Sequence, residues 1–121
     1  LVKQAKAELE KAIELDPQAL DGSAYTSLAS LYYQVPGWPI GFGDEDKAEA
    51  LFKQALAVNP DGIDPNYFHG DFLLHQKRYG EAQAALEKAL AAPARPGREV
   101  ADAGRRDEAR VLLAKVNEKL E

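Results

Sequence analysis

The sequence predicts an all-α protein built from repeated pairs of helices, and three observations support this fold class. Alanines and large apolar residues recur at spacings of four and three positions, which places them on one face of a helix. The same pattern returns along the chain at a repeat-like interval. Prolines follow each copy closely, and a proline ends a helix because it clashes with the preceding turn. These features are typical of a helical repeat protein.

The repeated pattern has the form A-x3-F/L-x2-A and occurs three times. Its copies are Ala5, Leu9 and Ala12; Ala48, Phe52 and Ala55; and Ala82, Leu86 and Ala89, followed by Pro17, Pro60 and Pro93. The step from the second copy to the third is 34 residues, since 82 − 48 = 34. Each copy predicts a helix whose small alanines allow a neighbouring helix to approach closely.

A partner helix precedes the second and third copies. The first of these helices carries Tyr25, Leu28, Ala29 and Tyr32, and the second carries Gly70 and Leu73, with Tyr79 in the following turn. This arrangement resembles the tetratricopeptide repeat, a helix–turn–helix unit with a small residue in helix A and alanines in helix B. The resemblance covers residues 1–94 and implies a solenoid wound as a right-handed superhelix.

We therefore expect six helices, at residues 2–15, 22–34, 45–58, 65–76, 79–91 and 98–120. They form one domain with a half repeat at 1–17, a repeat at 20–60 and a repeat at 63–96. A capping helix at 98–120 carries a last frame at Ala109, Leu113 and Val116. The half repeat shows only its helix B. We expect its apolar face (Leu9, Ala12 and Ile13) to be covered by a second copy or by upstream sequence.

Two aspartates are predicted to cap helices. Asp44 is followed by Glu45 and Asp46, and acids at this end favour a helix N-terminus. Asp64 precedes Pro65, which predicts an N-cap and a proline at the first helical position. The contiguous acids at 44–46 are better explained as helix-start residues than as calcium ligands, which would be spaced through a loop of about twelve residues.

Between the second and third helices lies "VPGWPIGFGDED", which we interpret as an insertion at residues 35–44 in the turn of the repeat. Acids stand where a phosphate loop would need a cation, so phosphate binding is disfavoured. Trp38, Ile40 and Phe42 alternate, and large apolar side chains are costly to leave in water. We expect an ordered arm folded back onto the repeats, with Trp38 as its anchor.

Charge and composition exclude several classes of protein. The chain has 15 Lys and Arg against 20 Asp and Glu, which argues against a nucleic-acid partner. It has no cysteine, and no apolar run is long enough to span a membrane. A local group of arginines has acidic neighbours, which predicts a solvated, salt-bridged helix face. This group comprises Arg95, Arg98, Arg105, Arg106 and Arg110, with Glu99, Asp102, Asp107 and Glu108.

The sequence offers no catalytic, cofactor or metal site. His69 and His75 lie about 240° apart on one predicted helix, so they do not share a metal. We expect His69 to be packed and His75 to contact Asp71. Serines accompany these residues, but no nucleophile turn or oxyanion site does, so we expect no enzyme.

The resemblance instead implies a protein or peptide partner in a concave groove lined by the A helices. The groove-facing residues would be Thr26, Ser30, Tyr33 and Gln34 from the first A helix, and Tyr67, Asp71, Leu74 and His75 from the second. Two alternatives remain: a self-associating structural module, dimerising through the first helix, and a small-ligand-binding accessory component of a bacterial transport system. Similar segments in exported bacterial repeat proteins favour the periplasm over the cytoplasm.

Overall fold

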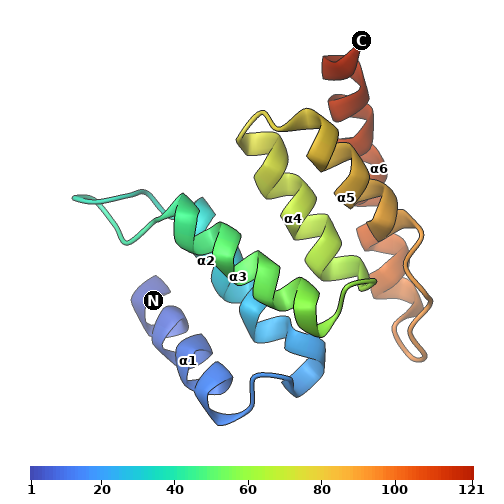
Figure 1. The fold of residues 1–121 in the computed structure, drawn as a ribbon. Helices are drawn as coiled ribbons and strands as arrows, with labels where there is room; N and C mark the ends of the chain where they lie inside the picture. Colours follow the sequence, from blue (N-terminus) through green and yellow to red (C-terminus); the bar gives the residue numbers. More distant parts are fainter. The chain divides into compact units, whose positions relative to one another are not determined.

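A computed structural model describes all residues, 1–121, and contains six α-helices and no β-sheet. The helices are α1 (Val2–Leu15), α2 (Ser23–Gln34), α3 (Glu45–Val58), α4 (Ile63–His75), α5 (Tyr79–Leu90) and α6 (Glu99–Leu120) (Figure 1). A short 3₁₀ helix, η1 (Ala19–Gly22), precedes α2. The six predicted helices are confirmed to within two residues at each end. None of these helices is both long and apolar enough to cross a membrane.

The chain divides into two compact units, Leu1–Pro60 and Asp61–Glu121. The first unit holds α1, α2 and α3, and the second holds α4, α5 and α6. Pro60 follows the end of α3, where a proline cannot continue the helix.

In the first unit, α2 and α3 pack as a helical hairpin. The frame residues of α3 form its core: Ala48 and Phe52 are fully buried and Ala55 nearly so, opposite the buried Leu28, Ala29 and Tyr32 of α2. Because alanine leaves room between the helix backbones, Phe52 can fill the space at their centre. The predicted close-packing role of Ala55 is confirmed.

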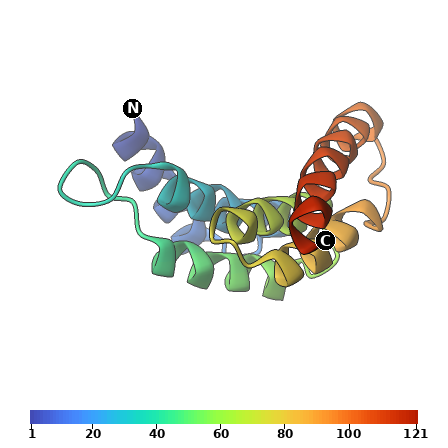
Figure 2. The same ribbon diagram turned by 90° about the horizontal axis from the view of Figure 1, so that it is seen from above.

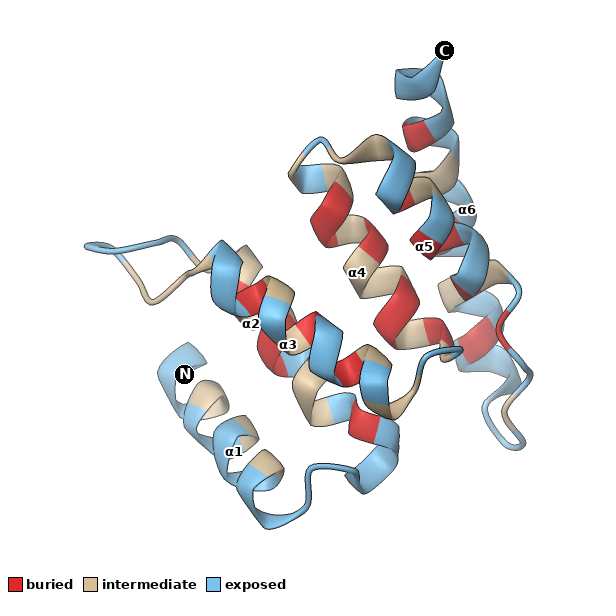
Figure 3. Cartoon of the chain, in the orientation of Figure 1, coloured by how far each residue is buried: buried red, intermediate tan, exposed pale blue.

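The first helix, α1, packs on α2 but contains no buried residue (Figure 3). Leu9 and Ile13 are half-buried, and Ala12 is exposed. Its one ion pair joins Lys6 to Glu10 at 3.7 Å on the surface, a contact of little energetic value. The apolar face of α1 is therefore only partly covered within this chain.

In the second unit, α4 and α5 form the equivalent hairpin. Ala82, Leu86 and Ala89 are fully buried. Gly70 of α4 meets Leu86 so closely that a Cβ at Gly70 would lie 2.7 Å from the Leu86 Cγ atom. The absence of a side chain at Gly70 thus sets the spacing of this hairpin, as the small-residue pattern predicts.

The last helix, α6, packs against both α4 and α5. Its frame residues Ala109 and Val116 are fully buried and Leu113 is half-buried, so the predicted helix and its buried frame are confirmed. The Gln83 side-chain amide of α5 also donates a hydrogen bond to Asn117 of α6, at 2.7 Å.

The N-cap predictions have different outcomes. The Asp44 carboxylate accepts a hydrogen bond from the Lys47 backbone amide at 3.1 Å, which confirms it as the N-cap of α3. The prediction for Asp64 is wrong, because α4 begins at Ile63 with Gly62 as its N-cap. Pro65 is tolerated inside the first turn, since backbone amides there need no partner within the helix. The Asp64 carboxylate binds arginines of the same unit instead.

Candidate partner-binding surfaces

On α2, the predicted partner-facing residues have unequal exposure. Thr26 is buried, so it offers little to a partner, whereas Ser30 and Tyr33 are half-buried and Gln34 is exposed. The Ser30 hydroxyl donates to the Thr26 backbone carbonyl at 3.0 Å. The Tyr33 ring lies against Phe52, with 6.0 Å between ring centroids. The accessible part of this stripe is therefore its C-terminal half.

On α4, all four predicted residues keep some exposure. Tyr67, Asp71 and Leu74 are half-buried, and His75 is exposed. His75 Nδ1 lies 2.8 Å from the Asp71 backbone carbonyl and 3.6 Å from its carboxylate, so the predicted Asp71–His75 contact is confirmed. His69, one turn before Leu73, is half-buried.

Tyr67 belongs to an aromatic and charged cluster that also involves α6. The Arg105 guanidinium lies 5.0 Å from the Tyr67 ring centroid and 4.7 Å from that of Phe68, within the range of cation–π attraction. Arg105 also pairs with Asp64 at 3.0 Å and with Glu108 at 3.0 Å. Burial, followed by the negative charge of Glu108, raises the pKa of the Tyr67 hydroxyl above its usual value. The Tyr67 hydroxyl is therefore harder to ionise than that of an exposed tyrosine.

The arginine-rich region near α6 is paired, as predicted, but it is not uniformly solvated. Asp102 is only 1% exposed, and its carboxylate binds the Arg95 guanidinium, with Arg95 Nε at 3.0 Å. Arg106 donates to the Ala92 backbone carbonyl at 2.9 Å. The sequence interpretation was wrong for Asp102, because it could not show that the loop before α6 folds Arg95 over this carboxylate.

The segment between α2 and α3, Val35–Asp44, forms an extended loop that we call the arm. In two views it projects beyond the ends of both helices (Figures 1 and 2). Trp38 is 89% exposed and Ile40 is 84% exposed. The prediction that the arm folds back on the repeats with Trp38 as its anchor is therefore wrong.

Phe42 is the residue that attaches the arm. Its ring meets the Tyr32 ring edge-on, at 5.6 Å between centroids, and Lys6 Nζ lies 5.5 Å from the Phe42 centroid. Lys47 Nζ lies 5.6 Å from the Tyr32 centroid. Phe42 is close in sequence to α3 and so reaches Tyr32, whereas Trp38 and Ile40 occupy the far end of the loop. Alternation of apolar residues could not distinguish these positions.

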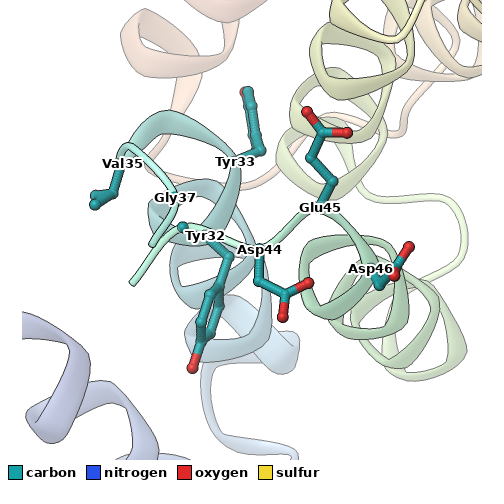
Figure 4. Close-up of a pocket in the computed structure, with 8 residues that line it drawn as sticks. Tyr32, Tyr33, Val35, Gly37, Asp44, Glu45 and Asp46 are labelled. Carbon is teal, nitrogen blue, oxygen red and sulfur yellow. The ribbon is translucent and has the colours of Figure 1, made fainter. Parts of the chain in front are cut away.

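At the base of the arm is a hollow of about 380 Å³. Figure 4 shows Tyr33 and Glu45 pointing in one direction and Tyr32 and Asp44 in the opposite one. The remaining lining comes from Val35, Gly37, Gly43 and Asp46. Three carboxylates in this lining make it unsuited to an anion.

The structure contains no cluster of three or more His, Cys, Asp or Glu residues that could hold a metal ion. A smaller apolar hollow of about 290 Å³ lies in the first unit, among α1, α2 and α3. Its apolar lining consists of Leu28, Tyr32, Ala50 and Leu51, with Glu10, Lys47 and Gln54 at its polar positions. Sequence reasoning missed it because it depends on how α1 rests on α2.

These hairpins define an all-α helical repeat protein in which, within each unit, every helix packs on its sequence neighbours. A sequence model of the tetratricopeptide repeat matches residues 40–102, more than half of the chain, and a second one matches residues 2–19. The chain therefore belongs to the tetratricopeptide repeat family. No curated protein matches it. Repeats of this family are typically protein–protein interaction modules, and no enzyme family matches the chain.

Proposed function

We propose that this chain is a non-enzymatic scaffold that binds a protein or peptide through the exposed stripes of its A helices, α2 and α4. The observation that carries the proposal is the exposure that remains once each hairpin has formed. The packing of α2 buries Leu28, Ala29 and Tyr32, whereas Tyr33 and Gln34 remain accessible to solvent. In α4, packing buries Phe72 and Leu73, whereas Leu74 and His75 remain accessible to solvent.

The chemistry of these stripes suits recognition of a polypeptide. Tyrosine is enriched in protein interfaces because its ring buries a large apolar area while its hydroxyl still forms hydrogen bonds. Tyr33 and Tyr67 both have rings held by neighbouring groups, Phe52 and Arg105 respectively. A ring that is already positioned loses less conformational entropy when a partner binds.

Affinity capture from a lysate of the source cell tests the proposal. The stripe variant combines Tyr33→Ala with Leu74→Ala, and the matched control combines Lys53→Ala with Glu87→Ala on exposed positions of α3 and α5. We expect one or more proteins to be captured by the parent and the control but lost with the stripe variant. Equal capture by all three chains, with all three folded by circular dichroism, would refute the proposal.

A second candidate function is small-ligand binding, as in an accessory component of a transport system. The hollow at the base of the arm favours it, since its volume of about 380 Å³ lies within the range of ligand pockets. Its lining is dominated by carboxylates and backbone, however, whereas such pockets are mostly apolar. A ligand bound there would raise the melting temperature, and replacing Tyr33 by alanine would abolish that rise.

Self-association is a further alternative, and the incomplete burial of α1 supports it. Light scattering over a range of concentrations distinguishes it from the main proposal. A scaffold for another protein stays monomeric at all concentrations, whereas a self-associating module shows a mass that rises with concentration.

A further inference from the structure

The tip of the arm, Trp38 and Ile40, presents two large apolar side chains to solvent at 89% and 84% exposure. Single exposed apolar residues are ordinary on protein surfaces, but a tryptophan and an isoleucine together at the end of one loop form a local apolar patch. Tryptophan is also among the residues that contribute most when an interface forms.

The base of the arm holds the tip in place. The Gly43 amide donates to the Pro36 carbonyl at 2.9 Å, and the Asp44 amide donates to the Tyr32 carbonyl at 2.9 Å. Near the tip, the Ile40 and Gly41 amides both donate to the Gly37 carbonyl, at 3.1 and 3.2 Å. The arm is therefore closed by backbone hydrogen bonds at its base and in its turn.

The two sides of the arm also lie so close together that only glycine fits at two of its positions. A Cβ on Gly43 would lie 1.9 Å from the Val35 carbonyl oxygen, and a Cβ on Gly41 would lie 2.6 Å from that of Pro36. Contacts this short exclude a side chain at either position. A loop ordered in this way loses little entropy on binding, so the exposed tip is prepared for a partner.

The charge near the arm determines which partner fits. Residues 35–46 contain Asp44, Glu45 and Asp46 and no Lys, Arg or His. These three carboxylates line the hollow at the base, together with Tyr33. Lys6 lies over the rings of Tyr32 and Phe42, and Lys47 lies over the ring of Tyr32. These lysines already occupy the two aromatic faces, so a cation from a partner would pair with the exposed carboxylates of Glu45 and Asp46.

A second copy of this chain is a poorer match. The first unit holds five Lys and Arg against nine Asp and Glu, a net charge of −4, and the whole chain has a net charge of −5. Docking one arm onto another acidic unit brings like charges together, which opposes association. Charge complementarity instead selects a basic partner.

We propose that the tip of the arm docks onto a protein segment that presents arginine or lysine beside aliphatic side chains. The aliphatic groups cover Trp38 and Ile40, and the cations face Glu45 and Asp46. This inference shares with the proposed function only the kind of partner, which is a protein. Its contact surface is the arm, whereas the proposed function uses the exposed stripes of α2 and α4.

Trp38 is the only tryptophan in the chain, so its fluorescence reports directly on the tip. The probes are two synthetic peptides, (Arg-Leu)4 and the matched (Glu-Leu)4, titrated into the intact protein at low salt. We expect (Arg-Leu)4 to produce a saturable blue shift that weakens as salt is added. We expect no shift with (Glu-Leu)4.

Variants locate the binding. Ile40→Ser, and separately Glu45→Gln with Asp46→Asn, should each weaken binding of (Arg-Leu)4 at least fivefold. Ile40→Ser should leave the melting temperature unchanged, whereas the double variant should melt slightly lower, because both acids lie in the first turn of α3, and is compared at a temperature where circular dichroism shows it folded. The charge-matched control, Glu87→Gln with Glu118→Gln on exposed positions of the second unit, should bind like the parent.

Three results would overturn the inference: no shift with (Arg-Leu)4, an equal shift with (Glu-Leu)4, or an equal loss in the control variant. A blue shift that appears on concentrating the protein alone would also overturn it, because a second copy would then cover the tip. The A-helix proposal stands or falls separately, since its capture experiment depends on Tyr33 and Leu74 and leaves Trp38 unchanged.

Discussion

The two hairpins have equivalent cores but differ in the turns that join their helices. Both bury the A-x3-F/L-x2-A frame completely or nearly so. In the second unit, residues 76–78 are enough to connect α4 to α5, whereas in the first unit Val35–Asp44 separates α2 from α3. The core therefore tolerates a long turn, because the turn is anchored at its base by Phe42 and leaves the helix contacts intact. The part of the arm beyond that anchor is available for binding.

The outer helices differ as well. In the first unit α1 packs on α2 and buries no residue, whereas in the second unit α6 packs on both α4 and α5 and buries Asp102, Ala109 and Val116. A helix held by buried contacts and a charged cluster opens less readily than one held by a half-exposed face. The following predictions test these contrasts.

The largest effect is expected in the hairpin cores. Phe52→Ala in the first unit and Leu86→Ala in the second remove fully buried side chains at equivalent positions. The free energy of unfolding should fall by about 3–5 kcal/mol for Phe52→Ala and about 2–5 kcal/mol for Leu86→Ala, through lost burial and the cavity left behind. Urea denaturation checks this. A loss under 1 kcal/mol at either position would mean that the two hairpins do not have equivalent cores.

Asp102→Asn should lower stability by about 1–3 kcal/mol, because it removes a charged acceptor from Arg95 in a buried site. The Arg95 side chain holds the pKa of Asp102 below its usual value, although burial partly opposes this. A depressed pKa contributes stability that is complete above the unfolded pKa of about 3.9 and is lost as pH falls below it.

Hydrogen exchange of the α6 amides, measured as the pH is lowered, tests this contribution. The parent should lose protection in α6 as the pH drops below about 4, and Asp102→Asn should start from lower protection and change less. An identical pH profile in both proteins would show that Arg95 and Asp102 do not stabilise α6.

Ala55→Leu and Ala89→Leu overfill the close contacts of the two hairpins, where both alanines are at most 1% exposed. Each should cost about 1–3 kcal/mol, as expected for extra atoms forced into a packed core. Thermal melting distinguishes this from the behaviour of a surface alanine. The matched control is Ala84→Leu at an exposed position of α5, which should melt like the parent.

The smallest effect on stability is expected in α1. Leu9 is only half-buried, so Leu9→Ala should cost less than about 1 kcal/mol, whereas Val116→Ala in α6 removes a fully buried side chain and should cost about 1–2 kcal/mol. If Leu9→Ala proves the more costly of the two, a further contact must cover α1 in solution.

Much of the fold was predictable from the sequence because repeat periodicity sets both helix bounds and core positions. Ala48, Phe52 and Ala55 could be identified as core residues without coordinates, and Asp44 could be identified as a cap. The start of α4 could not be predicted, because Asp64 has the local signature of an N-cap. Its carboxylate instead forms ion pairs with Arg95 and Arg105, which are distant in sequence.

The candidate binding surfaces were less predictable. The sequence indicates that Trp38, Ile40 and Phe42 are unusual, but only the path of the backbone decides which of them reaches Tyr32. The burial of Thr26 likewise depends on packing and not on its position in the repeat. Partner-facing residues cannot be separated from core residues until both neighbours of a helix are known.

The most direct test of the central claim, that the arm presents its tip away from the packed repeats, is the environment of Trp38 in the free protein. Emission and iodide quenching are measured for the native protein at low concentration and again in denaturant. We expect native emission close to that of the unfolded chain and quenching nearly as efficient, because Trp38 is 89% exposed. A blue-shifted, poorly quenched emission in the native monomer would contradict the account, since Trp38 would then be packed against the repeats.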